Sequence, residues 1–386
     1  MSIPQEISDY VVRMRRYFHE YPELSWQEEH TSQRIQEELS AMDIPFVRGR
    51  GTSIIATIQG ALPGKMLGIR ADIDALPVTE KTGLPFASAH QGVSHACGHD
   101  AHISILLAAA RMLNAEKDQL KGTVRLIFQS AEEFIQDSGA KYLAQDPLVR
   151  EVDAIIGLHI WGDIDAGKAA LQEGPIMASA DTFDIYIQGK NGHGASPHTA
   201  IDPITAGSEV VQALQLLVSR ENDPLEPMVL SITAFNSGNS KNVIPDTAHL
   251  EGTTRSFNNA LRDRFEGAMK RVLDGIATST RTHIQLDYHD GTPATVNHKE
   301  AVALGQHIAH EVFHDGLITD FPRVMGGEDF AKYLVEIPGC FMLLGCAGEG
   351  GHFAQHDEHF NLDERALPLG VEYFVSYARA YLGASE

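Results

Sequence analysis

The order of the expected helices and strands constrains the fold of this 386-residue chain more than any other feature. In the first part of the chain, apolar helical segments alternate with β-branched, strand-like segments such as residues 122–129 and 152–160. This alternation predicts an α/β layer fold with a largely parallel sheet. Between residues 182 and 288 the pattern changes to strand, helix, strand, strand, helix and strand, which is the order of a ferredoxin-like α+β sandwich.

This change of pattern also predicts the domain organisation. The α/β pattern resumes near residue 299, predicts a helix over residues 328–335 and a strand over residues 340–345, and continues to the last helix. We therefore expect a discontinuous domain of residues 1–178 and 291–386, into which a smaller domain of residues 179–290 is inserted. Two domains also suit the length of the chain, because a domain usually contains about 100–200 residues.

The composition argues against several classes of function. The formal net charge is −22, so the chain repels nucleic-acid backbones and anionic membranes. No apolar run approaches the ~18 residues of a membrane span, and the N-terminus lacks the pattern of a secretion signal. Three cysteines are no disulfide framework and indicate a reducing compartment. These features predict a cytoplasmic protein without nucleic-acid or membrane partners.

One short segment has an unusual density of metal-binding side chains. Residues 95–102 read His-Ala-Cys-Gly-His-Asp-Ala-His. Thiolate and imidazole groups are common ligands of zinc and similar ions. Cys97 and His99 are two positions apart, so in an extended or irregular segment their side chains share one face. The alternative is a histidine-rich surface loop beside a buried, unreactive cysteine.

Other candidate residues follow expected strands. Glu132 and Glu133 end one strand, where one could bind a metal while the other acts as general base, although a helix N-terminus also favours glutamate. His159 ends a second strand, as either a ligand or a satisfied core histidine. Asp72 and Asp74 follow a third strand and could orient ligand histidines or cap the next segment. In such sheets, ligands bind at the carboxyl ends of the strands.

A late loop supplies further histidines. Residues 350–359 contain His352, His356 and His359, one of which could donate a ligand. One thiolate, one carboxylate and three imidazoles fit two metal ions better than one, and such sites hydrolyse amides or esters. The chain contains neither a glycine-rich phosphate loop nor a G-x-S-x-G nucleophile turn.

These residues occur in motifs that resemble those of the M20 metallopeptidases. The motifs include GIRADIDALPVTE, HACGHDAH, IFQSAEE, GLHIWGDIDAG, NGHGASPH, NVIPD and GGEDFA, and they extend over nearly the whole chain. The resemblance is to the amidohydrolase branch, which holds N-acyl-amino-acid hydrolases, hippurate hydrolases, auxin-conjugate hydrolases and N-acetyldiaminopimelate deacetylases. It implies a dinuclear metal domain with an inserted ferredoxin-like lid that dimerises.

The resemblance also implies which residues bind metal. The implied ligands are Cys97, His99, Glu133, His159 and His356. His352 competes for the late position, but His356 stands four residues before a phenylalanine, as the family's late ligand does. These residues would hold two divalent ions of Zn, Mn, Co or Ni. Asp72 and Asp100 are expected to support the ligands from behind, and Asp100 is the residue of the 95–102 segment expected to orient a ligand.

Other residues are matched to roles in catalysis. Glu132 is implied to be the general base and later the proton carrier to the leaving amine. His193 is implied to stabilise the oxyanion in the site of the neighbouring subunit. Asn242 and Arg255 are implied to bind substrate, with the planar guanidinium of Arg255 suited to a carboxylate. Both could instead be ordinary structural residues of the lid.

The function implied by the resemblance is that of a cytoplasmic, homodimeric amidohydrolase. It would cleave a small N-acyl-amino acid into a carboxylic acid and a free amino acid. A metal-bound water would attack the amide carbonyl while Glu132 takes its proton. One alternative is a dipeptidase or carboxypeptidase that uses the same site. Another is a metal-binding protein without catalysis, against which the adjacent Glu132 and Glu133 argue.

Overall fold

The computed structural model of this protein describes residues 3–348 and 351–383. The chain divides into a first unit of Met1–Gly174, Val296–Pro322 and Asp329–Glu386, and a second unit of Pro175–Thr295 and Arg323–Glu328. The sequence predicted that Arg323–Glu328 belongs to the larger domain, but the structure places this segment in the second unit. It joins the second unit because the amide N–H of Ala178 donates to the carbonyl oxygens of Val324 (3.0 Å) and Gly326 (3.1 Å).

A mixed eight-stranded sheet forms the centre of the first unit. Its strands are β1 (Phe46–Arg48), β2 (Ile54–Gln59), β3 (Leu62–Asp72), β4 (Lys121–Gln129), β5 (Ala154–Asp165), β6 (Ala169–Ala170), β15 (Leu317–Ile318) and β16 (Gly339–Ala347). They lie in the order β1-β2-β4-β3-β5-β16-β6-β15. The central strands β4, β3, β5 and β16 are parallel to one another, whereas β2 pairs antiparallel with β4 and β6 with β16. The carboxyl ends of the central strands therefore meet at one edge of the sheet.

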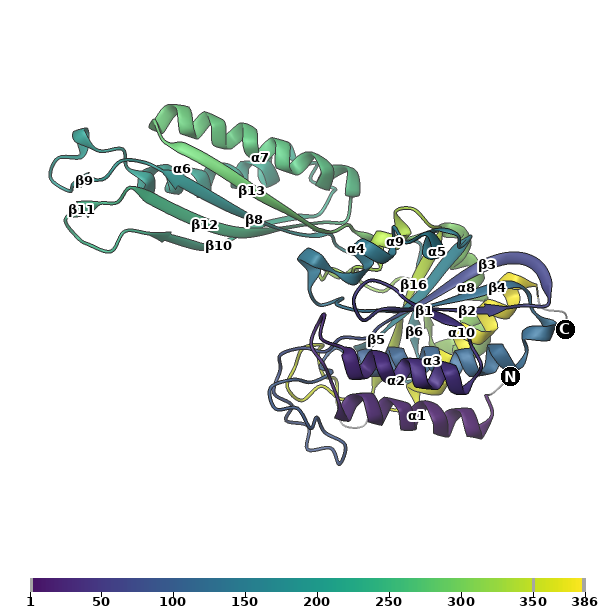
Figure 1. Cartoon of the computed structure of the whole chain (residues 1–386). Helices are drawn as coiled ribbons and strands as arrows, with labels where there is room; N and C mark the ends of the chain where they lie inside the picture. Colours follow the sequence, from purple (N-terminus) through teal and green to yellow (C-terminus); the bar gives the residue numbers. More distant parts are fainter. Residues whose placement is uncertain (1–2, 349–350, 384–386) are drawn as a thin grey trace. The chain divides into compact units, whose positions relative to one another are not determined.

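Helices accompany the sheet of the first unit (Figure 1). They are α1 (Gln5–Glu20), α2 (Glu29–Ala41), α3 (His99–Ala115), α4 (Gly139–Leu143), α5 (Pro147–Arg150), α8 (Lys299–Phe313), α9 (Ala331–Leu334) and α10 (Ala366–Leu382). Because the α3 sequence is apolar and rich in alanine, the helix is buried along most of its length. α1 and α10 pack against α3, and α10 also packs against α8. The N-terminus of α3 is thus held inside the core.

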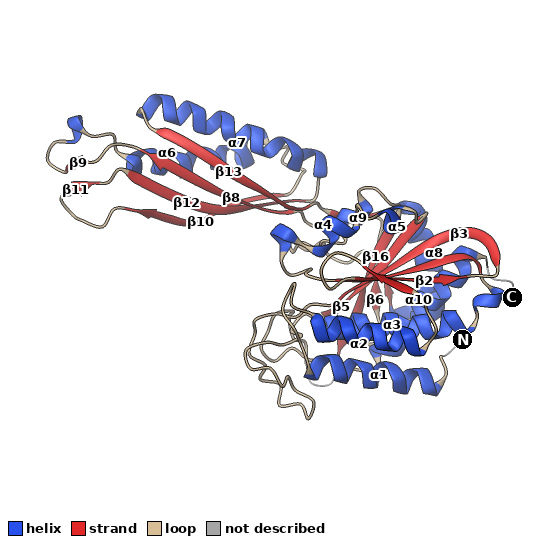
Figure 2. Ribbon diagram, in the orientation of Figure 1, coloured by secondary structure: helices blue, strands red, loops and turns tan. Residues whose placement is uncertain are grey.

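The second unit is an antiparallel sheet with two helices on one face (Figure 2). Its main elements are β8 (Ala180–Gln188), α6 (Pro203–Leu216), β10 (Met228–Ser237), β12 (Thr247–Ser256), α7 (Asn259–Thr280) and β13 (His283–Thr292). The strands lie in the order β10-β12-β8-β13. Phe183, Ile185 and Ile187 alternate along β8 and are buried in the core that also contains residues of α6 and α7. This is the β-α-β-β-α-β arrangement of a ferredoxin-like sandwich.

The mixed α/β fold expected from the sequence is confirmed, but one helix is shorter than predicted. The pattern predicted a helix over residues 328–335, whereas α9 spans only Ala331–Leu334. Asp329 stays outside the helix, where its carboxylate accepts hydrogen bonds from Arg70 (2.6 Å) and Gln129 (2.7 Å). The remaining short strands are β7 (Gly174–Met177), β9 (Gly192–His193), β11 (Val243–Ile244) and β14 (Thr295–Asn297). Among the described helices, none has the length and apolarity needed to cross a membrane.

Candidate metal centre

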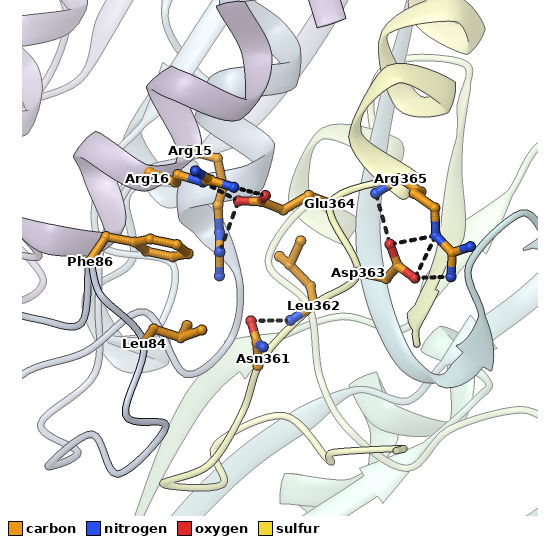
Figure 3. A pocket seen from close by; sticks show the side chains of 9 residues that line it. All are labelled: Arg15, Arg16, Leu84, Phe86, Asn361, Leu362, Asp363, Glu364 and Arg365. Carbon is orange, nitrogen blue, oxygen red and sulfur yellow. Dashed lines mark hydrogen bonds and ion pairs between the residues drawn. The ribbon is translucent and has the colours of Figure 1, made fainter. Parts of the chain in front are cut away.

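A pocket of about 530 Å³ in the first unit is distinct from the residues that the sequence proposed (Figure 3). Its lining consists of Arg15, Arg16, Leu84, Phe86, Asn361, Leu362, Asp363, Glu364 and Arg365. Its charges are matched in pairs: Arg16 donates to both carboxylate oxygens of Glu364 (2.9 and 2.6 Å), and Arg365 pairs with Asp363. Because the lining contains none of the residues predicted to bind metal or to act as base, and its carboxylates are paired with arginines, this pocket does not indicate the reaction site.

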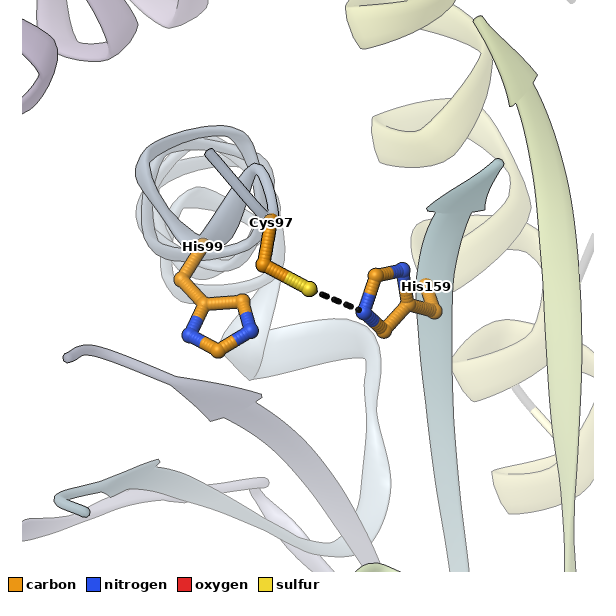
Figure 4. A group of neighbouring side chains, drawn as sticks. All are labelled: Cys97, His99 and His159. Carbon is orange, nitrogen blue, oxygen red and sulfur yellow. Dashed lines mark hydrogen bonds between the residues drawn. The ribbon is translucent and has the colours of Figure 1, made fainter. Parts of the chain in front are cut away.

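The proposed chemical residues meet instead near the carboxyl ends of the parallel strands. His99 is the first residue of α3, and Cys97 lies two positions before it. Glu132 and Glu133 follow β4, and His159 belongs to β5. The ligand atoms of Cys97, His99 and His159 lie within 4.8 Å of one another (Figure 4), as do those of His99, Glu132 and Glu133. His159 lies within its strand and not at the end as predicted, because β5 continues beside β16 as far as Asp165.

A residue in the left-handed conformation, Gly98, stands between Cys97 and the first residue of α3, His99. Gly98 has a φ of 87° and precedes the first residue of α3. A Cβ atom at this position would lie 2.1 Å from Cδ1 of Ile160, so glycine is required by space as well as by conformation. Across this turn, Sγ of Cys97 approaches Nε2 of His159 to 3.4 Å (Figure 4).

In His99 and His159, a hydrogen bond at Nδ1 leaves Nε2 as the nitrogen that can bind a metal. Nδ1 of His99 lies 2.9 Å from the carbonyl oxygen of Asp74, and Nδ1 of His159 lies 2.6 Å from the carbonyl oxygen of Ile160. A carbonyl oxygen can only accept, so both Nδ1 atoms carry the proton. Both Nε2 atoms are therefore directed at the cluster as possible metal ligands.

His102 has a different environment from its two neighbours. Its Nδ1 donates to Asp72 (2.6 Å), and its Nε2 accepts the amide N–H of Ile160 (2.9 Å). Both nitrogens are used, so His102 has no lone pair for a metal. Burial favours the neutral acid of Asp72, but Arg70 and the nearby histidines outweigh burial and hold the pKa of Asp72 well below its usual range. His102 and Asp72 thus form a buried support behind the cluster.

Asp100 does not contact a candidate ligand in the way the sequence predicted. Its carboxylate accepts hydrogen bonds from Nε of Arg15 (2.9 Å) and from Nδ1 of His19 (2.8 Å). The first turn of α3 directs Asp100 toward α1, which carries both partners. Asp74 makes the predicted contact instead, because its carbonyl oxygen and its Oδ1 (3.4 Å) both face Nδ1 of His99. The sequence signal for Asp74 was its alternation with Asp72 after a strand.

The late loop brings one histidine to the cluster. Nε2 of His356 lies 3.4 Å from Oε1 of Glu133, and Cys97, Glu133 and His356 form a further group with ligand atoms within 4.8 Å. Nε2 of His352 lies instead 3.3 Å from Asp165. The geometry therefore favours His356 over His352 as a late ligand. This group shares Cys97 with the His99–His159 group, so the donor set has room for two ions.

The buried donors fit divalent cations. Nε2 of His99 and Oε1 of Glu133 are buried, and neither has a hydrogen-bond partner among the described residues. Burial and the nearby Glu133 raise the pKa of the Cys97 thiol well above its usual range, so a thiolate there needs an adjacent cation. Burial lowers the pKa of His99, but Asp72 and Asp74 outweigh it and raise this pKa to about 10. The cluster thus has excess negative charge and the donor types that Zn²⁺ and similar ions accept.

Three further candidates lie in the second unit. His193 belongs to β9 and is exposed, with its Nδ1 accepting the amide N–H of Ala195 (3.1 Å). Asn242 precedes β11, which pairs with β9. Arg255 in β12 is half-buried and donates to the carbonyl oxygen of Thr254 (2.8 Å). β9 and β11 thus place His193 near Asn242 within this unit.

Comparison with known proteins assigns the family. Residues 68–380 match the model of peptidase family M20/M25/M40. The chain belongs to this family. The N-acetylcysteine deacetylase of Bacillus subtilis is 39% identical over 381 residues, which are 95% of this chain and 96% of that protein. Thermostable carboxypeptidase 1 of Saccharolobus solfataricus is 38% identical over 372 residues, which are 95% of this chain and 94% of that protein.

A solved structure agrees with the family assignment. The YXEP protein of Bacillus subtilis, described as a dinuclear metal-binding peptidase of the M20 family, is 36% identical to this chain. The two structures superpose with a TM-score of 0.86 over 99% of this chain and 100% of that one. Membership of the M20 family confirms the resemblance inferred from the motifs.

Proposed function

We propose that this M20-family protein is a metal-dependent amidohydrolase that splits small N-acyl-amino acids into a carboxylic acid and a free amino acid. The adjacent glutamates carry the proposal. Carboxylate oxygens of Glu132 and Glu133 lie 4.0 and 3.9 Å from the same Nε2 of His99, and Glu133 also lies 3.4 Å from His356. Two adjacent carboxylates beside the same candidate ligand can divide metal binding from proton transfer. The similarity to an N-acetylcysteine deacetylase supports the substrate class.

The first unit would bind two divalent ions of Zn, Mn, Co or Ni. Their proposed ligands are Cys97, His99, Glu133, His159 and His356. When bound, such ions polarise an amide carbonyl and make water a better nucleophile. Nε2 of His99 and Oε1 of Glu133 support this ligand set, because both are buried and neither has a hydrogen-bond partner among the described residues.

The chain's own side chains would move the proton and bind the substrate. Glu132 takes the proton of the attacking water and passes it to the leaving nitrogen, so that the amide C–N bond breaks and a free amine forms. His193 donates a hydrogen bond to the developing oxyanion. Asn242 and Arg255 contact the amino-acid part of the substrate, with the guanidinium of Arg255 opposite its carboxylate.

The second unit would serve as a lid and as the contact between two subunits. In this arrangement His193 acts in the site of the partner subunit, as the motif resemblance implies. We place the homodimer in the cytoplasm, because the three cysteines are all free and buried.

The substitution Glu132→Gln tests the proposal. The amide cannot accept the proton, so we expect turnover of N-acetyl-amino acids to fall by about 10²–10⁴-fold while two equivalents of metal remain bound. Glu336→Gln, an exposed position of the same unit, is the matched control and should keep full activity. Full activity in Glu132→Gln would contradict the role of this residue.

A substrate comparison distinguishes the amidohydrolase from the alternative peptidase function, which the similarity to a carboxypeptidase favours. Metal-stripped protein is reconstituted with Zn²⁺, Mn²⁺, Co²⁺ or Ni²⁺ and offered N-acetyl-amino acids and unblocked peptides. Preference for the acylated amino acids supports the amidohydrolase. Release of C-terminal residues from peptides at the higher kcat/KM would establish the carboxypeptidase instead.

A further inference from the structure

The turn formed by residues 130–133, here called the glutamate turn, is held in place by side chains. It follows the end of β4, so its amides are not part of the sheet. The amide N–H of Ser130 donates to Oγ of Ser53 (3.1 Å), and that of Ala131 donates to Oε1 of Glu28 (2.9 Å). Ala131 is buried with a φ of 53°, a conformation that a residue with a Cβ keeps only when its surroundings enforce it.

A single carboxylate holds the other half of the glutamate turn. Oδ1 of Asp74 accepts the amide N–H of Glu132, and Oδ2 accepts the amide N–H of Glu133, each at 3.0 Å. Ser25 Oγ donates to the same Oδ2 (2.7 Å), and the Asp74 side chain is fully buried. Because hydrogen bonds to a charged acceptor are stronger than neutral ones, this carboxylate fixes the backbone of both glutamates.

Asp74 also contacts the imidazole that lies between these glutamates and the thiol. Its carbonyl oxygen lies 2.9 Å and its Oδ1 3.4 Å from Nδ1 of His99. These contacts turn Nε2 of His99 toward the carboxylates of Glu132 and Glu133, at 4.0 and 3.9 Å. One residue therefore touches the proposed base and two proposed ligands without being either.

We propose that Asp74 is a positioning residue that sets the relative placement of Glu132, Glu133 and His99 through two main-chain amides and one imidazole. A shift of either amide would move a glutamate carboxylate relative to Nε2 of His99, so metal binding and proton transfer would change together. The kinetic part of this inference rests on the proposed amidohydrolase function, whereas the metal-binding part does not.

The substitution Asp74→Asn tests the proposal at nearly constant volume. Asparagine offers one oxygen to two N–H donors and places its own NH₂ against one of them. We expect the affinity for Co²⁺ to fall by about 10–100-fold, with a changed visible spectrum of the bound Co²⁺. We also expect kcat to fall by a similar factor while KM stays within about twofold, because Asp74 does not contact substrate.

Glu28→Gln is the matched comparison, since it makes the same isosteric change at the neighbouring amide. Glu28 serves only one amide of the turn, and glutamine keeps an oxygen for it; Thr52, which donates to Oε2 (2.6 Å), can accept from the new NH₂. We expect Co²⁺ affinity within about threefold of the parent protein. Equal losses in both variants, or parental affinity and spectrum in Asp74→Asn, would overturn the proposal.

Ser25→Ala provides the test if Asp74→Asn does not fold. It removes one hydrogen bond to Oδ2 and leaves the carboxylate in place, so we expect a several-fold loss of Co²⁺ affinity and a shifted spectrum. A spectrum and affinity identical to those of the parent protein would then refute the role of Asp74. A parent protein that binds two Co²⁺ ions but hydrolyses no N-acyl-amino acid would contradict the proposed function alone, because metal binding is measured without substrate.

Discussion

At the scale of single residues, the neighbours of each histidine determine what it can do. Three histidines lie within residues 95–102, yet their surroundings differ. His99 directs Nε2 at the candidate ligands, whereas both nitrogens of His102 are hydrogen-bonded within the protein. His95 is buried, and neither of its nitrogens has a hydrogen-bond partner in the described part of the chain. The three histidines therefore differ in whether a ring nitrogen is free to bind a metal or is used in hydrogen bonds within the protein.

His95 predicts a pH dependence of stability. Burial lowers its pKa to about 4, whereas the unfolded chain takes up this proton near pH 6.5. Between these values the unfolded state binds more protons, so stability is present above pH 6.5 and falls as the pH falls. In His95→Phe we expect the loss of unfolding free energy between pH 7 and pH 5 to shrink by roughly 2 kcal/mol. Urea unfolding of metal-free protein at both pH values measures this difference.

The control for this prediction is His307→Phe. His307 is on α8 and is largely exposed, so its replacement should leave the pH dependence of unfolding unchanged. If His95→Phe loses as much stability as the parent protein on acidification, the buried histidine does not cause the effect.

At the scale of elements, the junction before α3 combines a conformational and a steric constraint. Gly98 is in the left-handed region, and Ile160 of β5 occupies the space where a Cβ would lie. The helix start and the strand therefore approach each other closely enough for Cys97 to reach His159. The metal-ligand spacing depends on this close contact.

The substitution Gly98→Ala should disturb both the fold and the cluster. We expect the unfolding free energy to fall by about 2–4 kcal/mol, from backbone strain and displacement of Ile160, together with weaker Co²⁺ binding. Gly167→Ala is the matched control, because Gly167 also has a positive φ (93°) but no atom lies within 4 Å of the place where its Cβ would be. Thermal and urea unfolding of both variants would contradict the steric argument if the two losses were equal.

At the scale of the whole molecule, the second unit exposes large apolar side chains. Ile204 of α6 is 41% exposed and Leu225 after α6 is 87% exposed. The sheet of this unit also has two edge strands, β10 and β13. Exposed apolar groups and strand edges are surfaces that proteins commonly cover by association. These features support the proposed homodimer.

The dimer predicts a particle of twice the mass of one chain in light scattering after gel filtration. Ile204→Glu should shift the particle toward the monomer, because a buried charge at a subunit contact is costly. A glutamate in the first turn of α6 is compatible with the helix itself, so loss of folding is not expected. Val335→Glu, at a 61% exposed position of the first unit, should leave the mass unchanged. A monomeric parent protein would contradict the proposal.

Much of the fold could be predicted from local patterns. The apolar segments that became α3, β4 and β16 were recognisable because helix and strand periodicity depends on neighbouring residues. Strands of two or three residues, such as β6 and β15, were not predicted, because their existence depends on a partner strand that is distant in sequence. The helix predicted over residues 328–335 was too long for the same reason, since Arg70 and Gln129 hold Asp329 outside it.

The sequence by itself determined the types of donor, their order along the chain and the family to which they belong, because side-chain chemistry and motif spacing are local properties. Only the tertiary structure decided that Asp74, and not Asp100, contacts His99, and that His356 lies nearer to Glu133 than His352 does. The same holds for the two amides that Asp74 binds at Glu132 and Glu133. These contacts join residues that are distant in sequence, so their geometry follows from how the strands and α3 pack together.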